Sequence, residues 1–441
     1  MMSDSRLRLL YDISVLGNGH ANVLARTGIY RVAENVALGL VDSAQVAMEL
    51  CACSSLELYF HARDFHAESA RFRPLPFSTP PRPRTLEHRL QYAVVENTLK
   101  HGYAHLNTRI MRKFTRMAFP RSTGAMPLFD PASAEAAQIY HSPNFPIPEA
   151  MRAYPNLQCF LTVYDLIPIK FPHFFGELAG RMKAGSEQTL GSLRPEDWVL
   201  CISEATKRDL CEYRPDLAPE RMIVTPLAAS RDFYQVTDQA AIQRVKQKYH
   251  IPDGPYLLSL STLEPRKNID HVIRAFVKLV QEQHLPDLSL VLVGAKGWDS
   301  ARIFSAIDTS GGIIDRIIVT GYVEDADLPA LYSGALAFAY MSFYEGFGLP
   351  PLEAMQCGVP VITSNTSSLP EVVGEAGLQL DPCDLDGLCQ AIWEIYAHAS
   401  VREAMACKSL ARAQSFSWDG CVAKTIAAYQ HACNIGEAIA Q

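Results

Sequence analysis

The clearest pattern along the chain is a series of short apolar runs in its second half, each followed by a stretch of helical length. The runs begin at Tyr256 with YLLSLST and continue as LSLVLVG, IIVTG, ALAFAY and VPVIT. Continuous apolar runs of this length are typical of strands that are buried on both faces. Their alternation with helices predicts a parallel sheet covered by helices on both sides.

The first half shows the same alternation less regularly. Leu7 to Ser14 predicts a buried strand, followed by a loop around Gly17 and Gly19 and then by a helix from Gly28 to Leu40. Two further strands are predicted, at Gln158 to Tyr164 and Trp198 to Ile202. The fold class is therefore α/β in both halves.

The chain length predicts two domains with a cleft between them. At 441 residues the chain exceeds the roughly 250–300 residues at which a single core stops growing. We place the first domain at 1–230, with a proline-rich, basic insertion around 71–121, and a linker at 231–255. The second domain is placed at 256–415, and 416–441 is expected to form a helix that crosses back to the first domain.

Composition narrows the classes of function. Hydrophobic residues make up 48% and charged residues 20%, which is typical of a packed globular protein. The formal net charge of -7 provides no general attraction to nucleic acid, so we expect no nucleic-acid partner. Among the 11 Cys, only Cys51 and Cys53 are close in sequence and none has zinc-site spacing, so we expect reduced thiols and no metal. Because no stretch approaches the roughly 20 apolar residues of a membrane span, we expect a cytoplasmic protein.

The loops that follow the strands are the candidate sites, because ligands bind at the carboxyl ends of strands in open parallel α/β sheets. After YLLSLST comes LEPRKN, in which Arg266 and Lys267 stand beside the start of a predicted helix. Two cations and the free amides of a helix start are suited to binding a diphosphate. A solvated cation pair with Asn268 as helix cap would look the same in sequence, so this motif alone leaves both interpretations open.

A second candidate loop, FYEGFGLPPLEA, follows ALAFAYMS. Gly346 and Gly348 permit a close backbone approach, and Pro350 suits the first turn of a helix, so free amides there would face an anion. Glu345 and Glu353 stand eight residues apart on either side of this turn and can contact different parts of an extended ligand. A helix-dipole role for Glu353 is the simpler alternative, but it explains neither the glycines nor the prolines.

Glu345 and Glu353, with GFGLPPL between them, resemble the Glu-x7-Glu signature of glycosyltransferase family four, the retaining group 1 glycosyltransferases. The resemblance covers nearly the whole chain. STLEPRKNID is similar to the family's phosphate-binding loop, TGYVEDADLPALY to its base-binding region, and RTGIYRVAENV to its N-terminal glycine loop. HSPNFPIP and CISEATKRDL resemble its acceptor-side segment and the end of its first domain. The resemblance implies the GT-B fold, in which two Rossmann-like domains face each other across a cleft.

The resemblance also implies roles for individual residues. Arg266 and Lys267 would neutralise the diphosphate of a nucleotide sugar donor, Glu353 would accept from both ribose hydroxyls, and Glu345 would lie close to the transferred sugar. Further donor-binding residues are expected at Gly28, Tyr322, Val323, Gly346, Phe347, Gly348 and Leu349. No cofactor is expected beyond the donor substrate.

On the acceptor side the chain departs from the family pattern. Many members have a His-Asp pair at the end of a first-domain strand, whereas this chain reads Tyr164-Asp165. Asp165 and His141 are therefore the candidate catalytic residues on this side, although a lone histidine is more often structural. The group that receives the acceptor proton stays open, because retaining members are thought to pass it to the leaving phosphate.

Two other features have competing interpretations. Asp325 and Asp327 form an Asp-x-Asp pair, which a different transferase fold uses to hold a metal, but the helix that follows favours capping. An apolar stripe over 99–117 has basic residues along one flank and is suited to an anionic membrane surface, while packing on the first domain is the alternative. Contact with the inner face of the cell membrane is one hypothesis for this stripe.

The expected function is hexose transfer from a nucleotide diphosphate sugar to a glycan or lipid-linked glycan. The overall resemblance to mannosyltransferases of surface polysaccharide assembly favours GDP-mannose as donor, with UDP- and dTDP-sugars as alternatives. A sugar-phosphate or small-molecule glycoside synthase on the same fold is a second hypothesis, and a non-catalytic nucleotide-sugar-binding protein is a third. Acceptor assays separate the first two hypotheses, and failure to transfer or hydrolyse any donor would support the third.

Overall fold

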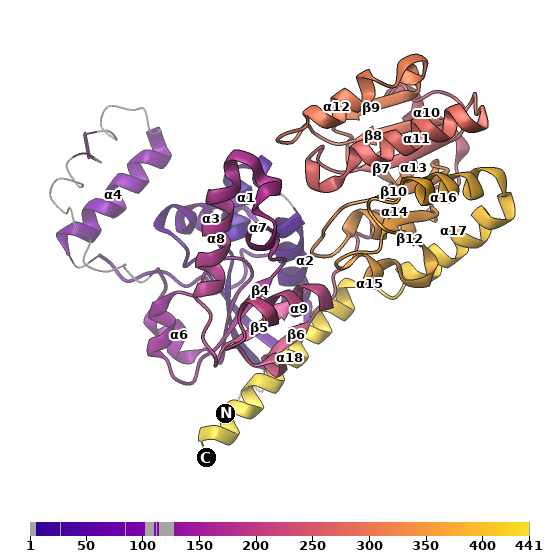
Figure 1. The fold of residues 1–441 in the computed structure, drawn as a ribbon. Helices are drawn as coiled ribbons and strands as arrows, with labels where there is room; N and C mark the ends of the chain where they lie inside the picture. The colour runs from indigo at the N-terminus through magenta and orange to yellow at the C-terminus, as the bar shows by residue number, and fades with distance from the viewer. Residues whose placement is uncertain are drawn as a thin grey trace.

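The computed structural model describes residues 6–26, 28–83, 85–101, 110, 111, 113 and 128–440. These residues form two six-stranded sheets, one in each half of the chain, in which every strand pair is parallel (Figure 1). The α/β prediction with two parallel sheets is thereby confirmed.

The first sheet has the strand order β2-β1-β3-β4-β5-β6. Its strands are β1 (Leu7–Asp12), β2 (Val46–Cys51), β3 (Ile139–Ser142), β4 (Gln158–Val163), β5 (Trp198–Cys201) and β6 (Met222–Val224). The second sheet has the order β12-β11-β10-β7-β8-β9. Its strands are β7 (Tyr256–Leu260), β8 (Ser289–Val293), β9 (Ile317–Gly321), β10 (Ala337–Tyr340), β11 (Val361–Ser364) and β12 (Leu378–Leu380).

Helices cover both faces of each sheet. Around the first sheet they are α1 (Ser14–Ala21), α2 (Gly28–Asp42), α3 (Leu56–Glu68), α6 (Pro131–Ala136), α7 (Ile167–Lys170), α8 (Ala179–Gly191) and α9 (Glu204–Tyr213). Around the second they are α10 (Gln239–Lys248), α11 (Ile269–Gln283), α12 (Ala301–Asp308), α13 (Leu328–Ser333), α14 (Leu349–Gln356), α15 (Leu369–Val373), α16 (Leu385–Ala397) and α17 (Ala399–Ala413). The helix α4 (Leu86–His101) packs on α3 and stands away from the first sheet (Figure 1). The last helix, α18, spans Trp418–Ala440.

The strands divide their side chains between separate cores, as period-two alternation requires. In β1, Leu9 and Tyr11 join one apolar cluster, and Leu10 between them joins another. In β7, Leu258 joins the first of these clusters and Leu257 a third one. The first cluster therefore extends through both halves of the chain.

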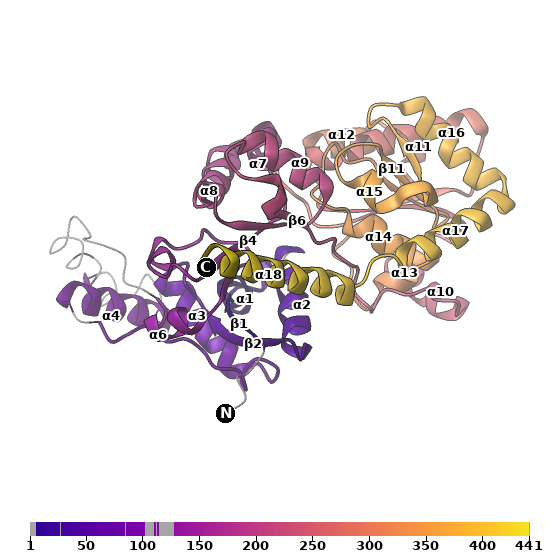
Figure 2. The same ribbon diagram turned by 90° about the horizontal axis from the view of Figure 1, so that it is seen from below.

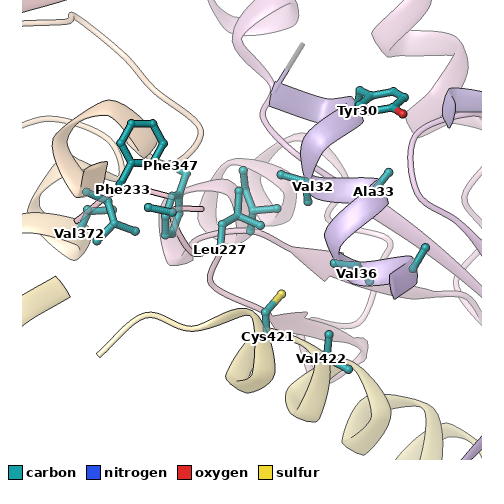
Figure 3. Close-up of a cluster of buried hydrophobic side chains, with 14 of the residues drawn as sticks. Tyr30, Val32, Ala33, Val36, Leu227, Phe233, Phe347, Val372, Cys421 and Val422 are labelled. Carbon is teal, nitrogen blue, oxygen red and sulfur yellow. The ribbon is translucent and has the colours of Figure 1, made fainter. Parts of the chain in front are cut away.

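Figure 3 shows where this shared cluster crosses between the halves. Val32 of α2 lies on one side, Phe347 of the second half on the other, and Leu227 between them. The last helix, α18, contributes Cys421 and Val422 from below. The two halves thus share buried apolar surface, which favours one preferred relative arrangement.

The helix α18 runs from the second half back along the first sheet (Figure 2), where it packs against α2. Its Tyr429 packs edge-on to Phe160 of β4, with ring centroids 4.9 Å apart. Residues 239–248, inside the expected linker, form α10, which packs on α13. The linker is therefore not a simple extended connection, and the domain boundaries at 230, 255 and 415 stay predictions.

The predicted loop around Gly17 and Gly19 is wrong. Both residues belong to α1, which begins two residues after β1 ends. A Cβ at Gly17 would lie 2.4 Å from the backbone nitrogen of Ala62 in α3. The glycine is therefore required for close packing of two helices, which sequence alone does not distinguish from a turn.

The membrane hypothesis concerned the segment 99–117, most of which lies outside the described residues. It therefore stays a prediction. No helix within the described part of the chain combines the length and apolar character that a bilayer span needs.

Candidate functional site

A cleft of about 710 Å³ lies between the two halves, at the carboxyl ends of both sheets. From the first half it is lined by loops after β4 and β5 and by the start of α2, and from the second by loops after β7, β8, β9 and β10. Its lining includes Asp165 and every residue predicted to bind the donor. The latter are Gly28, Arg266, Lys267, Tyr322, Val323, Glu345, Gly346, Phe347, Gly348, Leu349 and Glu353.

The centre of the cleft holds a compact group of four charges. Arg266 pairs with Glu345 through Nη1 and Oε2 at 2.8 Å, and with Glu264 through Nη2 and Oε1 at 2.8 Å. Lys267 Nζ donates to Glu345 Oε1 at 2.6 Å and to the hydroxyl of Tyr340 at 2.7 Å. Two cations therefore face two carboxylates, and the group is electrically balanced.

Burial and pairing act in opposite directions on these charges. Burial alone would raise the pKa of Glu345, but the nearby charges of Arg266 and Lys267, with hydrogen bonds from Lys267 and Ser342, lower it to about 2. Burial also lowers the pKa of Lys267, against the attraction of Glu345. Glu264 has a raised pKa, because its burial outweighs the attraction of Arg266. Glu345 is therefore the fully ionised partner of both cations.

The glycine turn after β10 offers unpaired amides to the cleft. Among the described residues, none accepts a hydrogen bond from the backbone N–H groups of Gly346, Phe347 or Gly348. A Cβ at Gly346 would lie 2.4 Å from the carbonyl oxygen of Tyr164, so no larger residue fits this contact between the halves. The turn leads directly into α14, with Pro350 in its first turn as predicted. Free amides and a helix start together make this loop suited to an anion.

Glu353 lies on α14 and is 9% exposed. The hydroxyl of Tyr332 donates to its Oε2 at 3.0 Å. Burial raises the pKa of Glu353 to about 7, although the Tyr332 hydrogen bond and the charge of Arg31 act in the opposite direction. With this pKa, Glu353 loses its proton near neutral pH, and the resulting carboxylate can accept hydrogen bonds from a ligand.

Comparison with known proteins shows the family of this chain. Residues 241–410 match the family model described as glycosyl transferases group 1. The O-antigen chain mannosyltransferase B of Escherichia coli is 37% identical over 294 residues, covering 66% of this chain and 74% of that protein. The chain belongs to the group 1 glycosyltransferases. This is a family of retaining hexosyltransferases.

A second sequence relative and a solved structure are also similar to this glycosyltransferase. The serotype-specific mannosyltransferase WbdA of Escherichia coli is 33% identical over 231 residues, which cover 52% of this chain but 28% of WbdA. A sucrose-phosphate synthase structure from Thermosynechococcus elongatus aligns with a TM-score of 0.61 at 19% identity, covering 97% of this chain and 98% of that chain. This structural likeness shows the GT-B fold.

The prediction of His141 as a site residue is wrong. His141 is 1% exposed and does not line the cleft. Its Nε2 lies 2.8 Å from Thr162 Oγ1, and its Nδ1 lies 2.6 Å from the hydroxyl of Tyr429. Burial lowers its pKa to about 3, so the ring is neutral. In this glycosyltransferase His141 links the first sheet to α18 through its hydrogen bond with Tyr429.

Capping by Asp325 and Asp327 is also wrong. Asp327 stands at the start of α13, but its side chain makes no cap. It accepts instead from Lys248 Nζ and from the hydroxyl of Tyr249, each at 2.7 Å, and so holds α10 on α13. Asp325 pairs with Arg31 of α2 at 2.8 Å, which bridges the two halves at the edge of the cleft.

One other group of potential ligands occurs among the described residues. Asp12, Cys51 and Cys53 place one oxygen and two sulfurs within 4.8 Å of one another. None of the three lines the cleft. The Asp12 carboxylate already accepts from the backbone N–H groups of Ser14 and Cys53 and from the hydroxyl of Tyr140. These bonds account for its burial.

Several residues in and around the site were not predicted from the sequence. Glu264 stands in the LEPRKN motif two residues before Arg266, and this spacing was the available signal. Tyr332 and Tyr340 lie in apolar runs and have no sequence feature that marks them as polar partners of Glu353 and Glu345. Ser203 binds the carbonyl of Gly346 from the other half, which requires knowledge of how the halves meet.

Proposed function

We propose that this glycosyltransferase transfers mannose from GDP-mannose to a glycan or lipid-linked glycan, with retention of the α-configuration and without a metal ion. One observation carries the donor part: Arg266 and Lys267 stand beside the unpaired amides of the 346–348 turn in a single cleft. The two Escherichia coli relatives are both mannosyltransferases, which supports mannose as the sugar.

The cleft supports a definite orientation of the donor. The diphosphate is expected between the two cations and the free amides, where it replaces part of the Glu345 contact. The ribose is expected at Glu353, whose Oε1 has no hydrogen-bond partner among the described residues. Tyr322, 73% exposed at the cleft edge, is available to stack on the base.

The chemistry follows from this arrangement. The bond between sugar C1 and the diphosphate oxygen breaks while the acceptor oxygen bonds to C1 on the same face. The acceptor proton passes to the departing diphosphate oxygen. Arg266, Lys267 and the amides stabilise the charge that grows on the leaving group, and Glu345 stabilises positive charge on the sugar ring. Because the two side-chain cations supply this charge, no metal is required.

Asp165 is the first-half residue best placed to meet the acceptor. It lines the cleft after β4, and its Oδ1 accepts from the N–H of Ile167 at 2.9 Å. Burial raises its pKa, and the Ile167 bond and the charge of Arg266 oppose this. We assign it to accept a hydrogen bond from the acceptor hydroxyl and orient it toward C1.

The first prediction tests this function directly. Incubation with GDP-mannose and a mannan-type acceptor in excess EDTA is expected to yield an α-linked product, measured from the anomeric coupling by NMR. UDP- and dTDP-sugars serve as matched donors. A β-linked product, or activity that EDTA removes and Mg²⁺ restores, would contradict the proposal.

The second prediction follows from the buried carboxyl of Glu353. The donor is expected to bind about tenfold more tightly at pH 8 than at pH 6. With a pKa of about 7, Glu353 is mostly protonated at pH 6 and must lose that proton to accept two ribose hydroxyls. Affinity therefore rises as pH rises through 7. The intact nucleotide sugar is used because it lacks a terminal phosphate, which titrates near pH 6.

Calorimetry at several pH values measures this effect, and Glu353→Gln is the matched variant. The groups that face Glu353, namely Tyr332, Arg31 and Asp325, are the same in both proteins. The variant is expected to show a flat profile. A sloping profile in the variant would assign the pH dependence to another group.

A further inference from the structure

The segment 203–206, which begins the SEATKRDL stretch, forms the N-terminal end of α9, just after β5, and lies where the two halves meet. Ser203 caps α9, and its Oγ accepts the N–H of Thr206 at 3.0 Å. Ser203 and Thr206 are 1% and 2% exposed. Capping uses only the acceptor side of the Ser203 hydroxyl, so its proton remains available to another group.

The distances assign the proton of each hydroxyl. Ser203 Oγ lies 2.7 Å from the carbonyl oxygen of Gly346, and Thr206 Oγ1 lies 2.9 Å from that of Tyr164. Thr206 is also 3.0 Å from Ser203 Oγ and 3.4 Å from the Gly346 oxygen, but the two shorter contacts use both protons. The start of α9 thus binds one carbonyl beside Asp165 and one in the donor loop.

Among the backbone carbonyls of the donor loop 343–347, one accepts from the first half, and the side chain of Tyr344 also reaches α9, where its hydroxyl donates to Asp209 at 2.7 Å. The other four carbonyls lie within hydrogen-bond distance of second-half side chains: Thr366 binds that of residue 343, Arg266 that of residue 344, and those of residues 345 and 347 share the single hydroxyl proton of Ser368. The fifth, of Gly346, accepts the proton of Ser203 from the first half, and Thr206 Oγ1 lies 3.4 Å from the same oxygen. One peptide of the loop is therefore oriented from across the cleft.

The orientation of this peptide decides where an amide points. In a trans peptide the C=O of one residue and the N–H of the next point in opposite directions, and no described peptide is cis. With the Gly346 oxygen turned to Ser203, the N–H of Phe347 is turned away from α9. Phe347 lines the cleft. We infer that Ser203 and Thr206 are positioning residues that aim the Phe347 amide at the donor.

Glu371 of α15 adds a second set of hydrogen bonds between the second half and the start of α9. Its carboxylate accepts from the N–H groups of Glu204 and Ala205, at 2.7 and 2.6 Å. A carboxylate is favoured at a helix start by the free amides and the dipole. Figures 1 and 2 both place α9 beside α15. The first half therefore completes the donor loop of the second, and the inference rests on the proposed donor site.

The experiment removes the hydroxyl of Ser203 and keeps the helix. Glycine is also a favourable N-cap residue, so Ser203→Gly leaves α9 formed. Its kcat is expected to fall about tenfold, because one amide loses its orientation toward the leaving group. The Kd for the nucleoside diphosphate should change by less than about threefold, since Arg266 and Lys267 still hold it.

Thr206 provides the second variant and its rescue. Thr206→Val is expected to lower kcat by several-fold, and Thr206→Ser to restore it. Ser55→Ala is the matched control, because Ser55 caps α3 in the same way and does not line the cleft. It should lower Tm and leave kcat unchanged.

The outcomes separate this inference from the proposed function. A wild-type protein that transfers mannose while Ser203→Gly and Thr206→Val turn over equally fast would overturn the positioning role alone. Loss of kcat only in proportion to lost folded protein, as judged against Ser55→Ala, would also overturn it. A wild-type protein that transfers no sugar would instead remove the proposed function.

Discussion

Glu345→Gln is expected to lower kcat by about 100-fold while binding the nucleoside diphosphate about tenfold more tightly. In the unliganded cleft Glu345 holds both Arg266 and Lys267, at 2.8 and 2.6 Å, so it competes with the diphosphate for them. Hydrogen bonds to charged groups contribute about 1.5–3 kcal/mol, which sets the size of the gain in affinity. The loss of kcat follows because the sugar loses its neighbouring negative charge in the transition state.

Calorimetry with the nucleoside diphosphate and steady-state kinetics with the full donor measure the two effects separately. Glu403→Gln, an exposed glutamate on α17, is the matched control and should change neither. If Glu345→Gln binds the diphosphate more weakly, Glu345 arranges the two cations for binding and does not compete for them. The assignment of Glu345 to the transition state would fail if kcat were unchanged.

Lys267→Ala is expected to lower kcat/KM by about 1000-fold and to destabilise the protein. Lys267 is nearly buried and donates to both Glu345 and Tyr340. Without it one cation faces two carboxylates, so the diphosphate loses a charge-assisted bond and meets a net negative group. Removing one partner of a buried ion pair also costs about 3–5 kcal/mol of unfolding free energy.

Donor kinetics and denaturant unfolding together test this expectation. Lys408→Ala, an exposed lysine on α17, is the control for loss of a lysine in the same half. Lys267→Arg keeps the charge in a wider, planar group and should recover stability more fully than activity. A variant Lys267→Ala that is destabilised yet retains its kcat/KM would make Lys267 a structural residue.

The grouping of the predicted donor-binding residues in one cleft was predictable from the sequence, because each of its motifs follows a strand. Arg266 and Lys267 follow β7, and Glu345 follows β10, which pairs with β7. Parallel strands separated by helices bring all their carboxyl ends to one edge, so residues distant in sequence meet there whatever the side chains between them. The apolar periodicity and the glycine turn were sufficient to place these residues together.

Residues whose role depends on contacts between elements were predicted less well. His141 resembles a site histidine in sequence, but it is buried outside the cleft lining, where Tyr429 of the returning helix α18 packs against β3 and β4. Asp327 has the position of a helix cap, yet its carboxylate accepts from Lys248 at the end of α10 and from Tyr249, which follows that helix. In each case a local rule was overridden by an element far away in the chain.

The division between the two kinds of feature has a physical basis. Strand and helix periods follow from backbone geometry, and loop chemistry follows from the residues of one turn, so both are present in a local stretch of sequence. Ionisation and orientation depend on the surroundings of a group. Both glutamates are buried, which raises the pKa of a carboxyl. Arg266 and Lys267 beside Glu345 lower its pKa to about 2, whereas Glu353 has no cation as close among the described residues and its pKa is about 7. The bond from Ser203 to Gly346 joins residues 143 positions apart in the sequence, and it exists only because the chain between them folds so that the two halves touch.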